Sequence, residues 1–218
     1  MDAAKLAAAR AALAELPPRG VIGLGTGSTA KLFIDLVGGR VAQGAQYTGV
    51  PTSDASRAQA AALGIPLLSD DGPWDIAVAV DGADEVSPAL DLIKGGGGAH
   101  TREKIINFSA TKNVIIVDES KLSPQLGTKW AVPVEVLAFA HAATARHLAQ
   151  LGNPVLRAGK TTDSGNVIYD LHACAIADPA ALDRALHAIP GVVETGLFIG
   201  RADVVIVAGA SGVRHLRR

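Results

Sequence analysis

Residues 81–103 combine acidic side chains, a lysine and four consecutive glycines, and these residue types together can act on a small, oxygen-rich anion. The segment contains Asp81-Gly82-Ala83-Asp84-Glu85, then Lys94-Gly95-Gly96-Gly97-Gly98, and then Thr101-Arg102-Glu103. The apolar run at 76–80 precedes it and indicates a buried strand. Ligands of open α/β sheets bind just beyond the carboxyl ends of strands. We therefore predict a ligand site in this segment.

The lysine and the glycine run predict stabilisation of negative charge. Four successive glycines cost conformational entropy, which a plain surface loop has little reason to incur. Their N–H groups can surround an oxyanion, and Lys94 beside them adds fixed positive charge. His100 also adjoins the run, but no nucleophile is paired with it in the sequence, so we treat it as a loop residue.

The acidic residues each have a structural alternative. Asp81 to Glu85 can form a polar turn or offer hard oxygens to Mg²⁺, but Lys94 competes for those carboxylates, so we predict no metal. Glu103 should fall in the first turn of a helix, where it can complement the helix dipole or act as a general base. Spacing alone favours the dipole role. Lys121 can be a surface lysine or can reach a bound phosphate.

A second candidate site lies near the amino terminus, where Gly23-Leu-Gly-Thr-Gly-Ser-Thr-Ala30 joins a strand to a helix. Glycines admit close approach of a ligand, and the helix start offers N–H groups and a positive dipole end, so phosphate is the natural ligand. A tight turn with an N-cap serine is the alternative. The relaxed dinucleotide fingerprint also fits. It needs an acid about 20 residues later, and residues 43–50 contain none, so the sequence disfavours NAD.

Alternating strands and helices predict a doubly wound, mostly parallel α/β sheet. The expected strands are at 21–24, 47–50, 65–68, 76–80, 114–117 and 202–208. The expected helices are at 2–16, 28–37 (ended by Gly38-Gly39), 54–63 and 101–109.

A second pattern begins near Trp130. Strands at 132–137, 155–157, 166–176 and 192–199, with helices at 139–151 and 179–189, give the ferredoxin-like order β-α-β-β-α-β. We therefore expect a catalytic doubly wound domain at 1–129 plus 201–218. An inserted, smaller ferredoxin-like α+β domain at 130–200 is expected to serve oligomerisation. The basic residues at 214–218 are expected to form a solvated tail.

Composition excludes several classes of protein. The 218 residues are 49% hydrophobic with a formal net charge of −1, which argues against nucleic-acid and membrane-surface binding. The single cysteine, Cys174, excludes an internal disulfide and lies in an apolar run, so we expect a buried small side chain. No signal-peptide pattern or long apolar run is present, so we expect a cytoplasmic protein.

Taken together, these motifs resemble the A-type ribose-5-phosphate isomerases. The matching pieces run in the family's order over nearly the whole chain. They are Gly25–Ala30, Ser53–Ser56, Asp81–Glu85, Lys94–Ala99, Thr101–Ile105, Asp118–Lys121, Val132–Val136 and Ile189–Val193. The family commonly has leucine where His100 stands and serine where Pro51 or Thr52 stands, so the local loop geometry is the part that the resemblance does not cover.

The resemblance implies interconversion of D-ribose 5-phosphate and D-ribulose 5-phosphate in the non-oxidative pentose phosphate pathway, with no cofactor, no required metal and a homodimer or larger homo-oligomer. It makes Glu103 the base that moves a proton between C2 and C1, and it leaves open whether Lys5 contacts phosphate. The other site residues that it implies are Thr26, Gly27, Ser28 and Thr29 on the phosphate, Asp81, Asp84 and Lys94 on the hydroxyl and carbonyl oxygens, the amides of Gly95, Gly96 and Gly97 on the enediolate, and Gly82, Ala83 and Lys121 on the substrate.

Two other functions remain open. A sugar-phosphate sensor domain of a transcription regulator would bind a similar ligand without chemistry. It would need a DNA-binding helix-turn-helix, for which two filled domains leave no space, and it would have no use for Glu103. A related sugar-phosphate deaminase would also transform a phosphorylated sugar, but the paired acids of Asp81-x-x-Asp84 and the Lys94 glycine motif favour the isomerase.

Overall fold

The computed structural model describes residues 2–172 and 175–218, so Cys174 lies outside the described part of the chain. The chain forms two compact units. The first unit contains the residues up to Gly82, Arg102–Ser120 and Arg201–Arg218, and the second contains Ala83–Thr101 and Lys121–Gly200. Residues 83–101 and 121–129, which the sequence pattern had placed with the larger sheet, thus group with the second unit.

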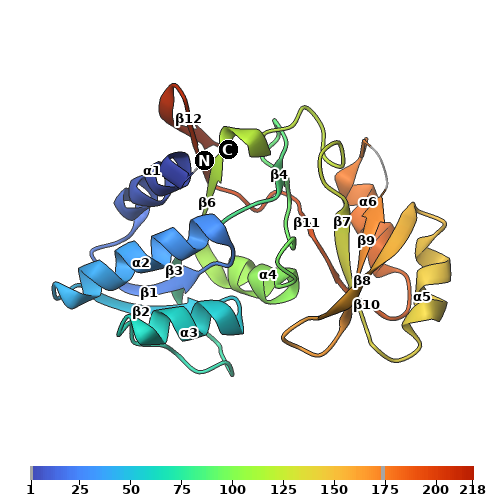
Figure 1. The fold of residues 1–218 in the computed structure, drawn as a ribbon, viewed down its shortest axis with the longest axis horizontal. Coiled ribbons are helices and arrows are strands. Elements are labelled where there is room, and N and C mark those ends of the chain that lie inside the picture. Colours follow the sequence, from blue (N-terminus) through green and yellow to red (C-terminus); the bar gives the residue numbers. More distant parts are fainter. Residues whose placement is uncertain (1, 173–174) are drawn as a thin grey trace. The chain divides into compact units, whose positions relative to one another are not determined.

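The first unit is built on a six-stranded sheet (Figure 1). Its strands are β1 (Arg19–Leu24), β2 (Gln46–Pro51), β3 (Ile76–Asp81), β6 (Ala110–Asp118), β12 (Val204–Gly209) and β13 (Gly212–Arg217), in the order β13-β12-β6-β3-β1-β2. All neighbours pair in parallel except β12 and β13. This confirms the mostly parallel sheet and the return of 202–208 to it. The order reverses at β1 and β3, which makes their carboxyl ends a topological switch point, where such sheets bind ligands.

Helices cover both faces of this sheet, so its central strands β3, β6 and β12 are mostly buried. The helices are α1 (Asp2–Ala12), α2 (Ser28–Ala42), α3 (Asp54–Ala62) and α4 (His100–Ser109). Val78 and Val80 of β3 belong to the core cluster that includes Phe33 of α2, whereas Ala79 packs in a separate cluster with Ile106 of α4. Successive strand residues point to opposite faces, so α2 and α4 lie on opposite faces of the sheet. No described helix is long and apolar enough to cross a membrane.

The second unit has the predicted ferredoxin-like arrangement. Its elements are β7 (Val132–Val136), α5 (His141–Leu148), β8 (Asn153–Thr161), β9 (Val167–His172), α6 (Pro179–His187) and β10 (Val192–Thr195). The antiparallel sheet order is β10-β7-β9-β8, and α5 and α6 lie along the same face of it (Figure 1). A separate three-stranded sheet joins β11 (Leu197–Phe198) to β5 (Leu92–Ile93) and β4 (Glu85–Val86). The single strand predicted at 192–199 is therefore divided between two sheets.

Two expected features of the first unit are wrong. Helix α2 continues through Gly38-Gly39 instead of ending there, because Gly38 is buried at a close approach to α3's end, where an added Cβ would lie 2.8 Å from the Leu63 Cβ. The strand predicted at 65–68 is reduced to one bridge, between Gly49 and Leu67. Glycine in a helix can reflect close packing rather than a stop.

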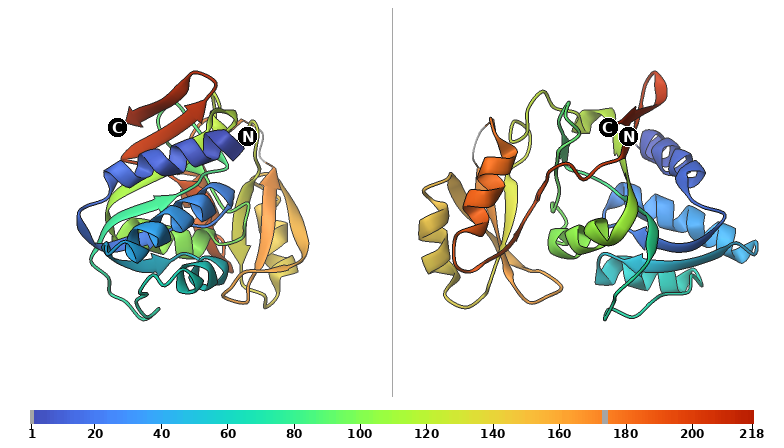
Figure 2. Two further views of the ribbon diagram at one scale, coloured as in Figure 1. Left: turned by 60° about the vertical axis from the view of Figure 1, so that its left-hand side comes forward. Right: turned by 180° about the vertical axis from the view of Figure 1, so that it is seen from behind.

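The basic carboxyl terminus is a strand rather than a tail. Residues 212–217 form β13, which pairs antiparallel with β12 in a hairpin beside α1 (Figure 2). Glu15, in the 3₁₀ turn η1 (Leu13–Glu15), contacts Lys112 at 2.5 Å, Arg217 at 3.0 Å and His215 at 3.3 Å. The hydrogen bond from Lys112, followed by the nearby positive charges, lowers the pKa of Glu15 despite its partial burial. Glu15 thus forms ion pairs with basic side chains of both β6 and β13.

Candidate active site

Two of the motifs that the sequence singled out contain a point where the chain passes from one unit to the other. One passage lies between Gly82 and Ala83, and another lies between Thr101 and Arg102. The first divides the Asp81–Glu85 motif and the second divides the motif that contains Glu103.

Asp81 ties together the two loops at the switch point. Its Oδ1 accepts hydrogen bonds from the N–H of Thr26 at 3.0 Å and from the N–H of Gly82 at 2.7 Å. A side chain at Gly25 would overlap the Asp81 carboxylate, so only glycine fits at the end of β1. Asp81 is itself buried. Its carboxylate therefore fixes the loop after β1 from the end of β3.

A cluster of hydroxyl groups holds Thr26, and the sequence analysis did not identify it. The Thr26 Oγ1 lies 2.6 Å from the Thr52 Oγ1 and 2.8 Å from the Ser53 Oγ. Ser53 is the N-cap of α3, accepting from the N–H of Ser56, and Ser56 donates to the carbonyl of Gly25 at 2.7 Å. The recognisable signal was the Ser53-x-x-Ser56 spacing directly after a strand, which is typical of a helix cap. This cluster joins the loop after β1 to the loop after β2.

The start of α2 is open to an anion. Gly27 is the N-cap residue at φ 111°, a left-handed conformation that favours glycine, so the alternative of an N-cap serine is wrong. Gly27 and Ser28 are exposed, while Thr29 is buried. Lys5 of α1 donates from its Nζ to the Ser28 Oγ at 3.0 Å, which brings a positive charge to this loop. The helix dipole, backbone N–H groups, hydroxyls and an ammonium group together suit a phosphate.

Glu103 occupies the first turn of α4, as predicted, and is only 4% exposed. Ile106, one turn later on the same face of the helix, packs against the sheet at Ala79. The neighbouring Arg102 donates to Asp54 at 2.8 Å, and Asp54 directly follows Ser53 of the hydroxyl cluster. Glu103 therefore lies at the same edge of the sheet as the loop of Thr26. A solvent-facing acid would suffice to complement a helix dipole, so its burial favours the general base.

Lys94 is a buried lysine in the second unit. It is 3% exposed, its N–H donates to the carbonyl of Gly196 at 2.9 Å, and its Nζ lies 5.4 Å from the centre of the Phe198 ring. Lysine is rarely buried without a compensating partner, and an aromatic face is one such partner. The backbone and ring contacts hold this cation at the start of the glycine run.

The glycine run is folded into a turn that Asp84 binds. The N–H of Gly98 donates to the carbonyl of Gly95, which has a φ of 103° that favours glycine. The N–H of Gly96 donates to the Asp84 Oδ2 at 2.7 Å. This amide orients Asp84, so of the three amides expected to face the enediolate, Gly96 is occupied within the protein. Gly95 is buried and Gly97 is exposed.

The other residues of the second unit that the sequence singled out differ in burial and in their contacts. Ala83 is half-buried. Glu85 is fully buried and accepts from the N–H groups of Gly127 and Lys129, which makes it a structural residue. Lys121 is half-buried, with its Nζ 5.2 Å from the centre of the Trp130 ring. His100 is buried against Gly95 instead of lying in a loop, and its Nε2 lies 3.4 Å from the Glu194 carbonyl.

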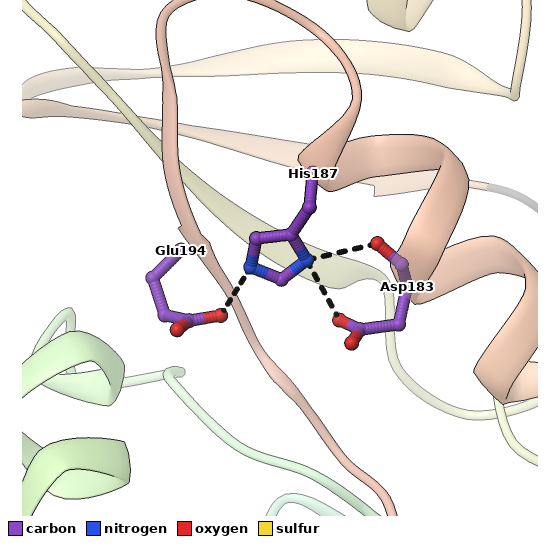
Figure 3. A group of neighbouring side chains, drawn as sticks. All are labelled: Asp183, His187 and Glu194. Atoms are coloured by element: carbon purple, nitrogen blue, oxygen red, sulfur yellow. Dashed lines mark hydrogen bonds and ion pairs between the residues drawn. The ribbon is translucent and has the colours of Figure 1, made fainter.

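One group of three possible metal ligands occurs among the described residues, and it contains none of the predicted site residues. Asp183 and His187 of α6 and Glu194 of β10 have ligand atoms within 4.8 Å of one another. Figure 3 shows the imidazole between the two carboxylates, with its Nε2 2.8 Å from Glu194 and its Nδ1 3.5 Å from Asp183. The contact between His187 and Glu194 fastens α6 to β10.

The fold and these residues define an α/β protein whose switch point has a helix start that suits a phosphate and a buried acid at the same edge of the sheet. The family model for ribose 5-phosphate isomerase A (phosphoriboisomerase A) matches residues 48–212. Ribose-5-phosphate isomerase A of Nitrobacter hamburgensis is 45% identical, with 100% of this chain and 99% of that protein covered. The Chloroflexus aurantiacus protein of the same name is 47% identical, with coverages of 97% and 92%.

Solved structures agree. The ribose 5-phosphate isomerase A of Methanocaldococcus jannaschii superposes with a TM-score of 0.94 at 41% identity, with 99% of each chain covered. A D-ribose-5-phosphate isomerase in complex with phospho-erythronic acid superposes with a TM-score of 0.95 at 42% identity, with 99% of this chain and 98% of that chain covered. The chain belongs to the ribose 5-phosphate isomerase A family. The resemblance seen in its motifs is thereby confirmed.

Proposed function

We propose that this protein interconverts D-ribose 5-phosphate and D-ribulose 5-phosphate through an enediolate. The observation that carries the proposal is the buried carboxylate of Glu103 at the edge of the sheet where the loop of Thr26 to Thr29 can hold a phosphate. An aldose–ketose shift removes a weakly acidic C–H proton and returns it to the adjacent carbon. One desolvated, aimed carboxylate can do both steps.

In the proposed reaction, Glu103 is the only group that takes a proton from carbon or returns one to it. In the open-chain aldose, Glu103 takes the proton from C2, and the electron pair moves so that the negative charge develops on O1. The proton of the C2 hydroxyl then passes to O1, while Glu103 returns its proton to C1. The carbonyl is now at C2, and the product is the ketose.

The developing charge needs fixed positive groups in a site that excludes water. We assign this role to Lys94, with the N–H groups of Gly95 and Gly97. Asp81 and Asp84 handle the hydroxyl protons, and Gly82, Ala83 and Lys121 contact the sugar. Gly96 contributes by holding Asp84, to which its N–H donates. Thr26, Gly27, Ser28 and Thr29 bind the phosphate, with Lys5 beside them.

The relatives support this proposal over a sensor domain or a deaminase. The solved relative with phospho-erythronic acid binds a phosphorylated sugar acid. Its planar carboxylate resembles the oxygen-bearing end of an enediolate, and intermediate mimics bind more tightly than substrates. We expect the same compound to bind this protein.

We also propose the setting in which the enzyme works. It acts on a small sugar phosphate in the non-oxidative pentose phosphate pathway, in the cytoplasm, without nucleic-acid or membrane partners. We expect a homodimer or higher homo-oligomer, to which residues 130–200 contribute. Sedimentation of the purified protein tests the assembly, and a monomer at micromolar concentration would contradict it.

An isomerisation assay tests the reaction. The protein is incubated with ribose 5-phosphate in the presence of EDTA, and ribulose 5-phosphate is followed by NMR. Unphosphorylated ribose is the matched control for the phosphate loop, and ammonia release from an amino-sugar phosphate tests the deaminase. We expect rapid turnover of ribose 5-phosphate alone. No turnover of it would overturn the proposal, and turnover that EDTA abolishes would overturn the absence of a metal.

A further inference from the structure

Arg157 lies on β8, an edge strand of the second unit's four-stranded sheet, and its side chain reaches the glycine run. Its Nη1 donates to the carbonyl of Gly95 at 2.9 Å and to that of Gly96 at 3.2 Å. Its Nε and Nη2 donate to the two carboxylate oxygens of Asp170 on β9, at 2.8 and 2.5 Å. One planar guanidinium therefore joins two strands to two successive peptide groups of the loop.

These bonds fix the directions of two amides. In a trans peptide unit, the carbonyl of one residue and the N–H of the next point in opposite directions. Holding the Gly95 carbonyl thus directs the N–H of Gly96 away from Arg157, where it meets Asp84 at 2.7 Å. Holding the Gly96 carbonyl likewise directs the N–H of Gly97 away from Arg157. Gly97 is exposed, so this N–H can meet a ligand.

A glycine loop needs such a restraint more than other loops do. Glycine populates both signs of φ, so a run of four samples many peptide orientations. An oxyanion site works only when its donors are aimed before the charge develops. Most of β8 is exposed, yet Arg157 is only 16% exposed and its contacts are with the loop and Asp170.

We propose that Arg157, held by Asp170, is a positioning residue of the isomerase. It sets the peptide planes of the glycine run so that Gly96 holds Asp84 and Gly97 faces the enediolate. This inference rests on the proposed function of the same loop. Asp170 acts through Arg157 by fixing the plane of its guanidinium.

The test compares Arg157→Gln with Lys160→Gln, which removes the same charge from an exposed position on the same strand. Each variant is assayed for kcat, KM for ribose 5-phosphate, affinity for phospho-erythronic acid and melting temperature. A misplacement of about 1 Å can cost about 10²-fold in rate. We expect kcat of Arg157→Gln to fall by about 10- to 100-fold, with KM changed by less than about threefold. The mimic's advantage over substrate should shrink, and Lys160→Gln should behave as the wild type.

Two further variants keep the inference testable if Arg157→Gln folds poorly. Asp170→Asn leaves the guanidinium but loosens its orientation, so kcat should fall less, again with little change in KM. Arg157→Lys can reach a carbonyl but cannot form the paired bonds to Asp170, so it should recover part of the rate.

The outcomes separate the two proposals. Normal kcat and normal mimic affinity in folded Arg157→Gln or Asp170→Asn, with a lowered melting temperature, would make the pair a structural bridge and overturn its positioning role alone. A wild-type protein that does not isomerise ribose 5-phosphate would overturn the proposed function and the positioning role with it.

Discussion

Replacing Glu103 with glutamine separates the two roles that its place in α4 allows. Glutamine keeps the size and shape of the buried side chain but cannot take a proton from carbon. If Glu103 only complements the helix dipole, its loss lowers the folding stability by about 0.3–1 kcal/mol, at most about a fivefold change in the folding equilibrium, and leaves kcat close to that of the wild type. If Glu103 is the base, kcat should fall by about 10²- to 10⁴-fold, equivalent to about 2.7–5.4 kcal/mol of activation free energy.

Asp54 provides the matched control. It is also an acid in the first turn of a helix, but its side chain is 66% exposed. Asp54→Asn therefore removes a dipole-complementing charge without touching a buried carboxylate. Both variants should lose little stability in urea unfolding, whereas only Glu103→Gln should lose turnover.

Isotope exchange makes the assay specific for the proton transfer. In D₂O, the wild type should place solvent deuterium at C1 of ribulose 5-phosphate, because the carboxyl proton of Glu103 exchanges with solvent before it is returned. Glu103→Gln should bind phospho-erythronic acid and incorporate almost no deuterium. A folded Glu103→Gln with kcat within about fivefold of the wild type would refute the reasoning from burial.

Three other changes test separate parts of the molecule. Ser28→Ala combined with Thr29→Ala should raise KM more than it lowers kcat, because the phosphate is remote from the reacting carbons; unchanged affinity for ribose 5-phosphate would contradict the phosphate loop. Lys94→Ala should lower kcat by about 10²- to 10³-fold and reduce the preference for phospho-erythronic acid over substrate; an intact preference would make the lysine structural. Glu15→Gln should lower the free energy of unfolding at pH 7 by about 1 kcal/mol. Because the folded pKa of Glu15 lies below its usual value of 4.5, the stabilisation is present above that pH and is lost as pH falls through the folded pKa. Urea unfolding of both proteins at pH 7 and pH 3 should therefore show a difference that narrows in acid, and a constant difference would contradict the ion-pair account.

The sequence was informative where a local rule and the tertiary structure agree. The order of strands and helices predicted five strands of the six-stranded sheet and all strands of the four-stranded sheet, because each apolar run lies between clear turn residues. The loop of Thr26 to Thr29 and the first turn of α4 were predicted for the same reason. Their glycines and acids mark the ends of elements, which is where the proposed site residues lie.

Prediction failed where a distant part of the chain decides the local structure. Nothing in the sequence near Gly38 shows that Leu63 packs against it, so the end of the helix is predicted too early. From the sequence alone, the basic residues after Gly212 suggest a solvated tail, because their partners, β12 and Glu15, are distant in the chain. Arg157 lies 62 residues from Gly95, and no spacing in the sequence connects the two.

The covalent joints between the two units limit how this enzyme can be recombined. The chain crosses from one unit to the other after Gly82, Thr101, Ser120 and Gly200. Three of these joints fall inside the motifs around Asp81, Glu103 and Lys121. The second unit is therefore not one continuous segment of the chain that could be exchanged at two junctions. A chimaera made from two homologues by exchanging a whole unit would have to splice through those motifs. Exchange should preserve activity only when both parents contribute the same residues on either side of each splice.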